Sequence, residues 1–67
     1  MISDERLAAM GLRRVQKALA IDDLYVAERN AGPHLLTVHE IRDGYVVSVE
    51  PKYCYDVWEC VPVEAAP

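Results

Sequence analysis

Phenylalanine is absent from the 67 residues of this chain, and several features that mark particular classes of protein are absent as well. No apolar run approaches the roughly 20 residues that a membrane-spanning helix needs. The first residues, Met1 to Arg6, are polar where a secretory signal peptide would have an apolar core. We therefore expect a cytoplasmic protein that does not enter a membrane.

The motifs of the common catalytic sites are also absent. The chain has no Gly-rich phosphate-binding loop, no Gly-x-Ser-x-Gly turn and no His-Glu-x-x-His pair. A hairpin would bring His39 close to Ser48 and Glu50, but an open sheet face lacks the desolvated pocket that acid–base chemistry needs. The sequence therefore predicts a protein that is not an enzyme and that uses no cofactor.

Cysteine and histidine are scarce, with two of each. If residues 53–63 are extended, about 20 Å separates the Cα atoms of Cys54 and Cys60, well beyond the roughly 7 Å that a disulfide tolerates. Structural zinc sites usually place about two to four residues between paired cysteines, and the spacing here is longer. We expect free thiols and no bound metal.

Positive charge is in the minority, with 7 basic and 11 acidic residues and a net charge of -4. The acidic excess lies in residues 33–67, which therefore repel nucleic acid and favour a basic partner. The sequence also does not match a helix-turn-helix motif beginning near Leu7, because Lys17 would occupy a position where this motif has a branched apolar residue. We do not expect nucleic acid to be a partner.

The N-terminal third of the chain has a helical pattern. Ser3 is a favourable N-cap, Asp4 and Glu5 suit the positive end of a helix dipole, and strong helix formers follow. These signals predict an amphipathic helix over about residues 4–20, with Gly11 on its apolar face. The basic edge of this helix comprises Arg6, Arg13 and Lys17. We expect the apolar face to cover the protein's own sheet, with contact to a second copy as the alternative.

The next segment carries conflicting signals. An acidic pair at its start and Gly32-Pro33 at its end are typical of a short helix, whereas Leu24-Tyr25-Val26 favours a strand. We favour a strand near residues 23–29 that turns through residues 30–33, and the short helix remains the alternative.

A β-hairpin is predicted over about residues 35–50, because Asp43-Gly44 is typical of a two-residue type I′ turn and β-branched runs flank it. In this register Arg42 opposes Tyr45. The predicted inner face comprises Leu36, Val38, Tyr45, Val47 and Val49, and the predicted wet face comprises Thr37, His39, Ser48 and Glu50. A three-residue turn is the alternative, but it separates apolar from polar side chains less cleanly.

Residues 53–63 alternate in polarity and predict an edge strand, which Pro62 and acidic side chains would protect from aggregation. The fold class that follows is α+β. We expect one domain over residues 1–67, with the N-terminal helix packed on a small antiparallel sheet of three or four strands.

The predicted edge strand also has the most functional character, because aromatic side chains are common interface anchors. These aromatic side chains are equally well explained as core residues, because the chain has no phenylalanine to fill its core. We predict a non-enzymatic protein–protein interaction module, a homodimer, that binds a basic protein partner through this strand. The predicted partner-binding residues are Tyr53, Tyr55, Asp56, Trp58 and Glu59, and a further acidic surface comprises Glu40, Glu50 and Glu64.

Two alternative functions remain open. One is a small acidic inhibitor, of the kind that phages encode, which blocks a nucleic-acid-binding or defence protein. The other is a virion or assembly component. The inhibitor requires the acidic residues to share one surface, and the assembly component requires a stable complex of many copies.

Overall fold

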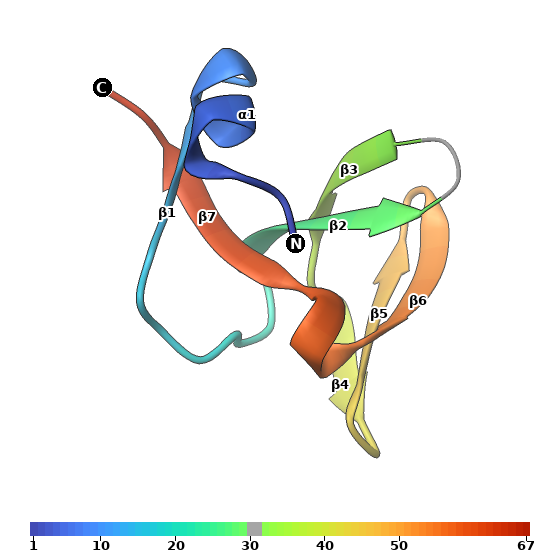
Figure 1. Ribbon diagram of the computed structural model, residues 1–67. Coiled ribbons are helices and arrows are strands. Elements are labelled where there is room, and N and C mark those ends of the chain that lie inside the picture. Colours follow the sequence, from blue (N-terminus) through green and yellow to red (C-terminus); the bar gives the residue numbers. More distant parts are fainter. Residues whose placement is uncertain (30–31) are drawn as a thin grey trace.

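A computed structural model describes residues 1–29 and 32–67 of the chain. The elements in chain order are α1 (Asp4–Ala9), β1 (Leu12–Arg14), β2 (Leu24–Arg29), β3 (Gly32–Thr37), β4 (Glu40–Arg42), β5 (Tyr45–Val49), β6 (Lys52–Asp56), the 3-10 turn η1 (Val57–Glu59) and β7 (Val61–Ala65) (Figure 1). Over the described residues the domain is small, compact and dominated by antiparallel sheet, with a single short helix.

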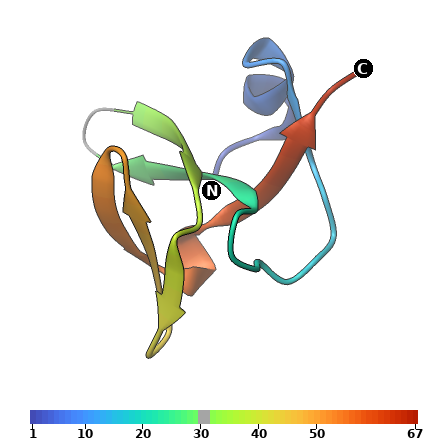
Figure 2. The ribbon, with the colours of Figure 1, turned by 180° about the vertical axis from the view of Figure 1, so that it is seen from behind.

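The described strands form two antiparallel sheets. The larger sheet has the order β1-β7-β2-β3, and the smaller has the order β4-β5-β6. The chain passes from the larger to the smaller sheet between β3 and β4, and it returns through η1 into β7 (Figures 1 and 2). Antiparallel pairing is as predicted, but a helix covering one sheet is not the main architecture.

The predicted helix over residues 4–20 is wrong beyond Ala9. Its N-cap is confirmed, because the Ser3 hydroxyl accepts a hydrogen bond from the Arg6 N–H at 3.2 Å. Gly11 has φ +76°, a left-handed conformation that ends helices, and residues 12–14 then pair with β7. Strand pairing outweighs the helix propensity of this segment. Among the described residues, no helix has the length and apolarity to cross a membrane.

Two clusters of buried side chains make up the core. The first lies between the two sheets and comprises Tyr25, Ala27, Leu36, Val38, Val46, Tyr55 and Cys60. The second lies on the other face of the larger sheet and comprises Ile2, Leu7, Leu12, Val26, Val61 and Val63. The helix therefore contributes Leu7 to the second cluster and does not pack on the hairpin. Strand β2 is buried on both faces, and the strand predicted near residues 23–29 is confirmed.

The turn of the predicted hairpin is confirmed, but its first strand is divided. Asp43 and Gly44 both have positive φ, and Arg42 pairs with Tyr45 as a two-residue turn requires. Leu36 instead pairs with Tyr25 in β2, and the Val38 N–H donates to the Asp23 carbonyl at 2.9 Å. The predicted pairing of this segment with the end of β5 is therefore wrong.

The division of the strand also changes which side chains of β5 face inward. Leu36 and Val38 are buried as predicted, but Ser48 is buried and its predicted place on the wet face is wrong. Tyr45 and Val49 are 46% and 50% exposed and Val47 lies on the same face of β5, so the predicted place of these three residues on the inner face is wrong too. The chain crosses between sheets at residues 38–39. The alternation of inward and outward side chains before this crossing therefore does not continue into β4 and β5.

The single edge strand predicted over residues 53–63 is also wrong. The turn η1 divides it into β6, which lies at an edge of the smaller sheet, and β7, which lies between β1 and β2. Pro62 therefore sits in an interior strand. The other predicted turn, at residues 30–33, includes Asn30 and Ala31, which lie outside the described residues.

Candidate functional site

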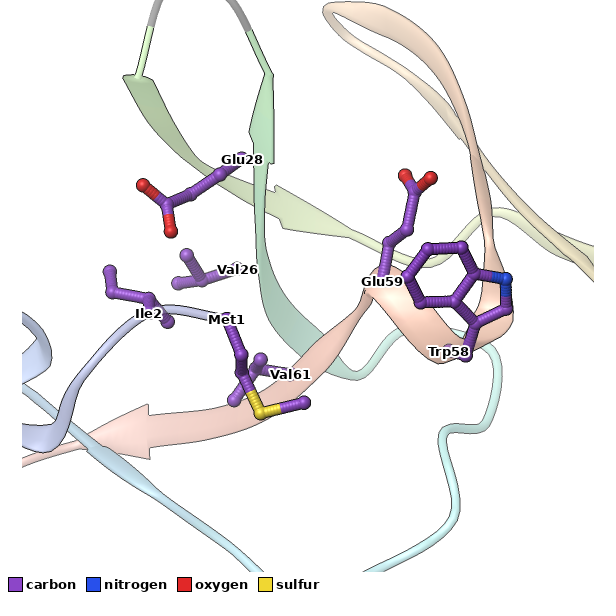
Figure 3. Close-up of a pocket in the computed structure, with 7 residues that line it drawn as sticks. All are labelled: Met1, Ile2, Val26, Glu28, Trp58, Glu59 and Val61. Carbon is purple, nitrogen blue, oxygen red and sulfur yellow. The ribbon is translucent and has the colours of Figure 1, made fainter.

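A pocket of about 250 Å³ opens between the N-terminal segment, the larger sheet and η1. Its lining residues are Met1, Ile2, Val26, Glu28, Trp58, Glu59 and Val61 (Figure 3). This volume is below the roughly 300–1,000 Å³ of sites for drug-sized ligands and cofactors. The pocket is therefore of a size for one side chain.

The floor of the pocket is part of the folded core. Val26 in β2 pairs with Val61 in β7, and both side chains are buried in the second cluster with Ile2. The Ile2 carbonyl accepts a hydrogen bond from Arg14 Nη2 at 2.7 Å, which holds the N-terminal segment against the sheet. The floor is therefore apolar and fixed before any ligand arrives.

Trp58 stands at the rim of the pocket and is 72% exposed. Its position is set by η1, which begins where the Val57 N–H donates to the Gly44 carbonyl and closes where the Cys60 N–H donates to the Val57 carbonyl. In Figure 3, Trp58 and Glu59 lie on one side of the pocket and Ile2 lies across from them. A large aromatic side chain left in water beside an apolar pocket is typical of an interaction site.

Two carboxylates give the pocket its charge. Glu28 Oε2 accepts a hydrogen bond from Arg6 Nη1 at 2.7 Å. Glu59 is less well satisfied, because its Oε2 lies 3.6 Å from Arg29 Nη2, too far for a hydrogen bond. This oxygen is buried and has no hydrogen-bond partner among the described residues, while the Glu59 side chain as a whole is 22% exposed. Each carboxylate already lies beside an arginine of the chain, and only the exposed part of Glu59 is within reach of a cationic ligand in the pocket.

The structure separates Trp58 from the two tyrosines of the predicted binding strand. Tyr55 is fully buried in the first cluster, where Arg29 lies 4.4 Å from its ring centre and desolvation raises its pKa. Tyr53 is half-buried, with its ring 4.9 Å from that of His34 and 5.6 Å from that of Tyr55. Trp58 is the one that meets the pocket.

Of the two acidic residues predicted in this strand, Glu59 reaches the pocket and Asp56 does not line it. Asp56 is the last residue of β6 and pairs with Tyr45 of β5 in the smaller sheet. Sequence reasoning missed five lining residues, which are Met1, Ile2, Val26, Glu28 and Val61. No local pattern marks them, because they come from three separate segments of the chain.

The predicted acidic surface is distributed over several elements. Glu40 binds Arg42 at 2.8 Å within β4, and Glu64 in β7 accepts a hydrogen bond from Arg13 of β1 at 2.6 Å. Glu50 lines a second pocket together with Val49 and His39. The alternative of a small acidic inhibitor stays a prediction.

The second pocket has a volume of about 290 Å³ and brings His39 close to Glu50. Ser48 does not join them, because its hydroxyl is buried and binds Tyr25 and the Thr37 carbonyl. Within residues 1–29 and 32–67, no three His, Cys, Asp or Glu side chains come together as a metal site requires.

The two cysteines are free thiols in different environments. Cys54 is exposed on β6. Cys60 is buried, and desolvation, together with the negative charges of Glu59 and Asp56, raises the pKa of Cys60 to about 12. Because the thiolate is the reactive form, we expect iodoacetamide to alkylate one thiol in the folded chain and both in guanidinium chloride, as counted by mass spectrometry.

A Cys54→Ser variant is the control for this alkylation. It is expected to take up no label while folded and one label when unfolded. Rapid labelling of the folded variant would contradict the buried position of Cys60.

Comparison of the chain with protein-family models, with curated protein sequences and with solved structures found no match. Its function has to be argued from the pocket and from the surface of the chain itself.

Proposed function

We propose that this chain is a non-enzymatic protein-binding module that receives a basic side chain of a partner protein in the pocket beside Trp58. The observation that supports it most is an exposed tryptophan at the rim of a pocket with an apolar floor and carboxylates in its walls. Each part of this arrangement matches one part of an arginine or lysine side chain.

The apolar stem of such a side chain suits the floor. Arginine and lysine carry three or four methylene groups below the charged head, and these groups prefer apolar surface. Val26 and Val61 lie at the bottom of the pocket, and the more exposed Met1 and Trp58 supply apolar surface around them. The size of the pocket limits the ligand to one side chain, so the remaining affinity comes from the partner's backbone and neighbouring residues.

The charged head suits the rim. A cation over the face of a tryptophan ring gains about 0.5–2 kcal/mol, depending on how far it is desolvated. Glu59 supplies a half-buried acceptor on the same side of the pocket (Figure 3). We favour arginine over lysine, because its planar guanidinium stacks on an aromatic ring and still donates hydrogen bonds at its edge.

Long-range electrostatics act in the same direction. The chain has a net charge of -4, and a basic partner is drawn to it before contact is made. Salt therefore has to weaken the association if the proposal is right.

Trp58 is the single tryptophan of the chain, so its fluorescence reports on the pocket directly. The test titrates the full chain with a capped peptide that carries one arginine between glycines. The matched peptide carries citrulline, which has nearly the same shape but no charge. We expect the arginine peptide to change the Trp58 emission with a Kd of about 1 mM or weaker, since one side chain makes few contacts, and we expect citrulline to have no effect.

Variants locate the binding. Glu59→Gln is expected to weaken arginine binding about tenfold, because it removes the charge beside the ring. Glu64→Gln is the matched control, an exposed carboxylate on β7 that does not line the pocket, and it is expected to bind normally. Equal responses to the arginine and citrulline peptides would overturn the proposal.

A further inference from the structure

A second exposed apolar surface lies on the outer face of the smaller sheet. Val46 and Ser48 of β5 point into the core, so the alternating residues Tyr45, Val47 and Val49 point outward. Tyr45 and Val49 are about half exposed. These three side chains form an apolar column along the middle strand of the sheet.

Charged side chains flank this column on both sides. Glu40 and Arg42 lie beside it on β4, and Lys52 and Asp56 lie beside it on β6. The four charges cancel, although the whole chain has a net charge of -4. This face, which we call the outer face, is therefore a neutral patch on an acidic protein. Charge repulsion between two copies of the chain is therefore small when they meet here.

The register of the sheet arranges these charges in rows. Arg42, Tyr45 and Asp56 lie in one row, because Tyr45 pairs with Arg42 on one side and with Asp56 on the other. Opposite charges thus stand at the two ends of a row with an aromatic ring between them. Among the described residues, no basic side chain forms an ion pair with Asp56.

We propose that the outer face joins two copies of the chain into a dimer whose two-fold axis runs along β5. This axis places the β5 columns of the two copies against each other and lays β4 of each copy over β6 of the other. Arg42 of one copy then faces Asp56 of the second copy, and the symmetry makes this ion pair twice. Face-to-face sheets pack about 10 Å apart, a distance that the side chains of this column fill.

Arg42 is able to make this contact without losing its present one. Its Nη2 donates to Glu40 Oε2 at 2.8 Å in the single chain. The guanidinium has five N–H donors, so the remaining donors are free to bind Asp56 of the second copy. The outer face shares no residue with the Trp58 pocket, and the dimer is therefore independent of the proposed function.

Sedimentation velocity of the full chain tests the dimer. We expect a species of twice the 7.5 kDa chain mass, whose fraction rises with concentration. Arg42→Glu and Asp56→Arg are each expected to weaken the dimer about tenfold or more, because each places like charges opposite one another twice. An equimolar mixture of the two variants is expected to form a heterodimer, because the opposite charges then face each other again.

Arg13→Glu is the matched control, since Arg13 is also an exposed, ion-paired arginine but lies on β1. It is expected to dimerise like the parent chain, and circular dichroism shows whether each variant is folded. A parent chain that stays monomeric at millimolar concentration would overturn the proposal. So would a parent dimer whose two charge variants, both folded, fail to associate when mixed.

Discussion

Replacing Tyr55 with alanine is expected to unfold the chain, whereas replacing Trp58 with alanine is expected to leave it folded. Tyr55 is fully buried between the two sheets, and truncating a buried aromatic side chain costs about 3–5 kcal/mol. The core of a domain this small supplies about 3–5 kcal/mol of net stability, so the loss is comparable with the whole. Trp58 is mostly exposed, and surface substitutions usually change stability by about 0.5 kcal/mol or less.

Urea denaturation followed by far-ultraviolet circular dichroism measures both variants. Tyr55→Phe is the control, because it keeps the ring and removes a hydroxyl that is buried without a hydrogen-bond partner among the described residues. This variant is expected to be at least as stable as the parent chain. A Tyr55→Ala variant with an unchanged denaturation midpoint would show that the aromatic side chains are not divided between core and pocket as described.

The features predicted correctly from the sequence depend on residues close together in the chain. The Ser3 cap involves the N–H of Arg6, and the turn at Asp43-Gly44 requires two adjacent residues that tolerate positive φ. The strand Leu24–Arg29 is marked by its own β-branched and aromatic residues. Local backbone preferences are sufficient to specify each of these features.

The features predicted wrongly depend on pairing between distant segments. Leu12 pairs with Ala65, and no local pattern in residues 12–20 reveals that a strand from the other end of the chain is available. Gly11 was a readable signal, since glycine is the usual residue just after a helix. The helical spacing of apolar residues continues beyond Gly11, so this glycine was interpreted as part of an apolar helix face and not as the end of the helix.

The pocket was predictable only in part, for the same reason. Trp58 and Glu59 were identified from their chemistry, whereas Val26 and Val61 have the pattern of core residues and become a pocket floor only when β2 meets β7. The turn η1 breaks the alternation between Tyr55 and Trp58. A strand pattern alone therefore does not reveal which of the aromatic side chains is left in water.

Ser48, which was wrongly predicted to lie on the wet face of the hairpin, contributes to the stability of the core. Its replacement by alanine is expected to lower the free energy of unfolding by about 1–3 kcal/mol. The Ser48 hydroxyl donates to the Thr37 carbonyl at 2.7 Å, so its single hydrogen is used there. The Tyr25 hydroxyl must then be the donor in its hydrogen bond to Ser48. This chain of hydrogen bonds links β2, β5 and β3 within the core, and alanine leaves the buried Tyr25 hydroxyl without an acceptor.

A double-mutant cycle separates this network from simple loss of packing. In the Tyr25→Phe background no buried hydroxyl remains to be orphaned, so Ser48→Ala is expected to cost less there than in the parent chain. Urea denaturation midpoints of the four proteins give the coupling free energy. Burial raises the pKa of Tyr25 further above neutral pH, where a tyrosine hydroxyl is protonated in any case and is able to donate. If the effects of the two substitutions were additive, the hydrogen bond between Tyr25 and Ser48 would make no contribution to stability, which would contradict the prediction.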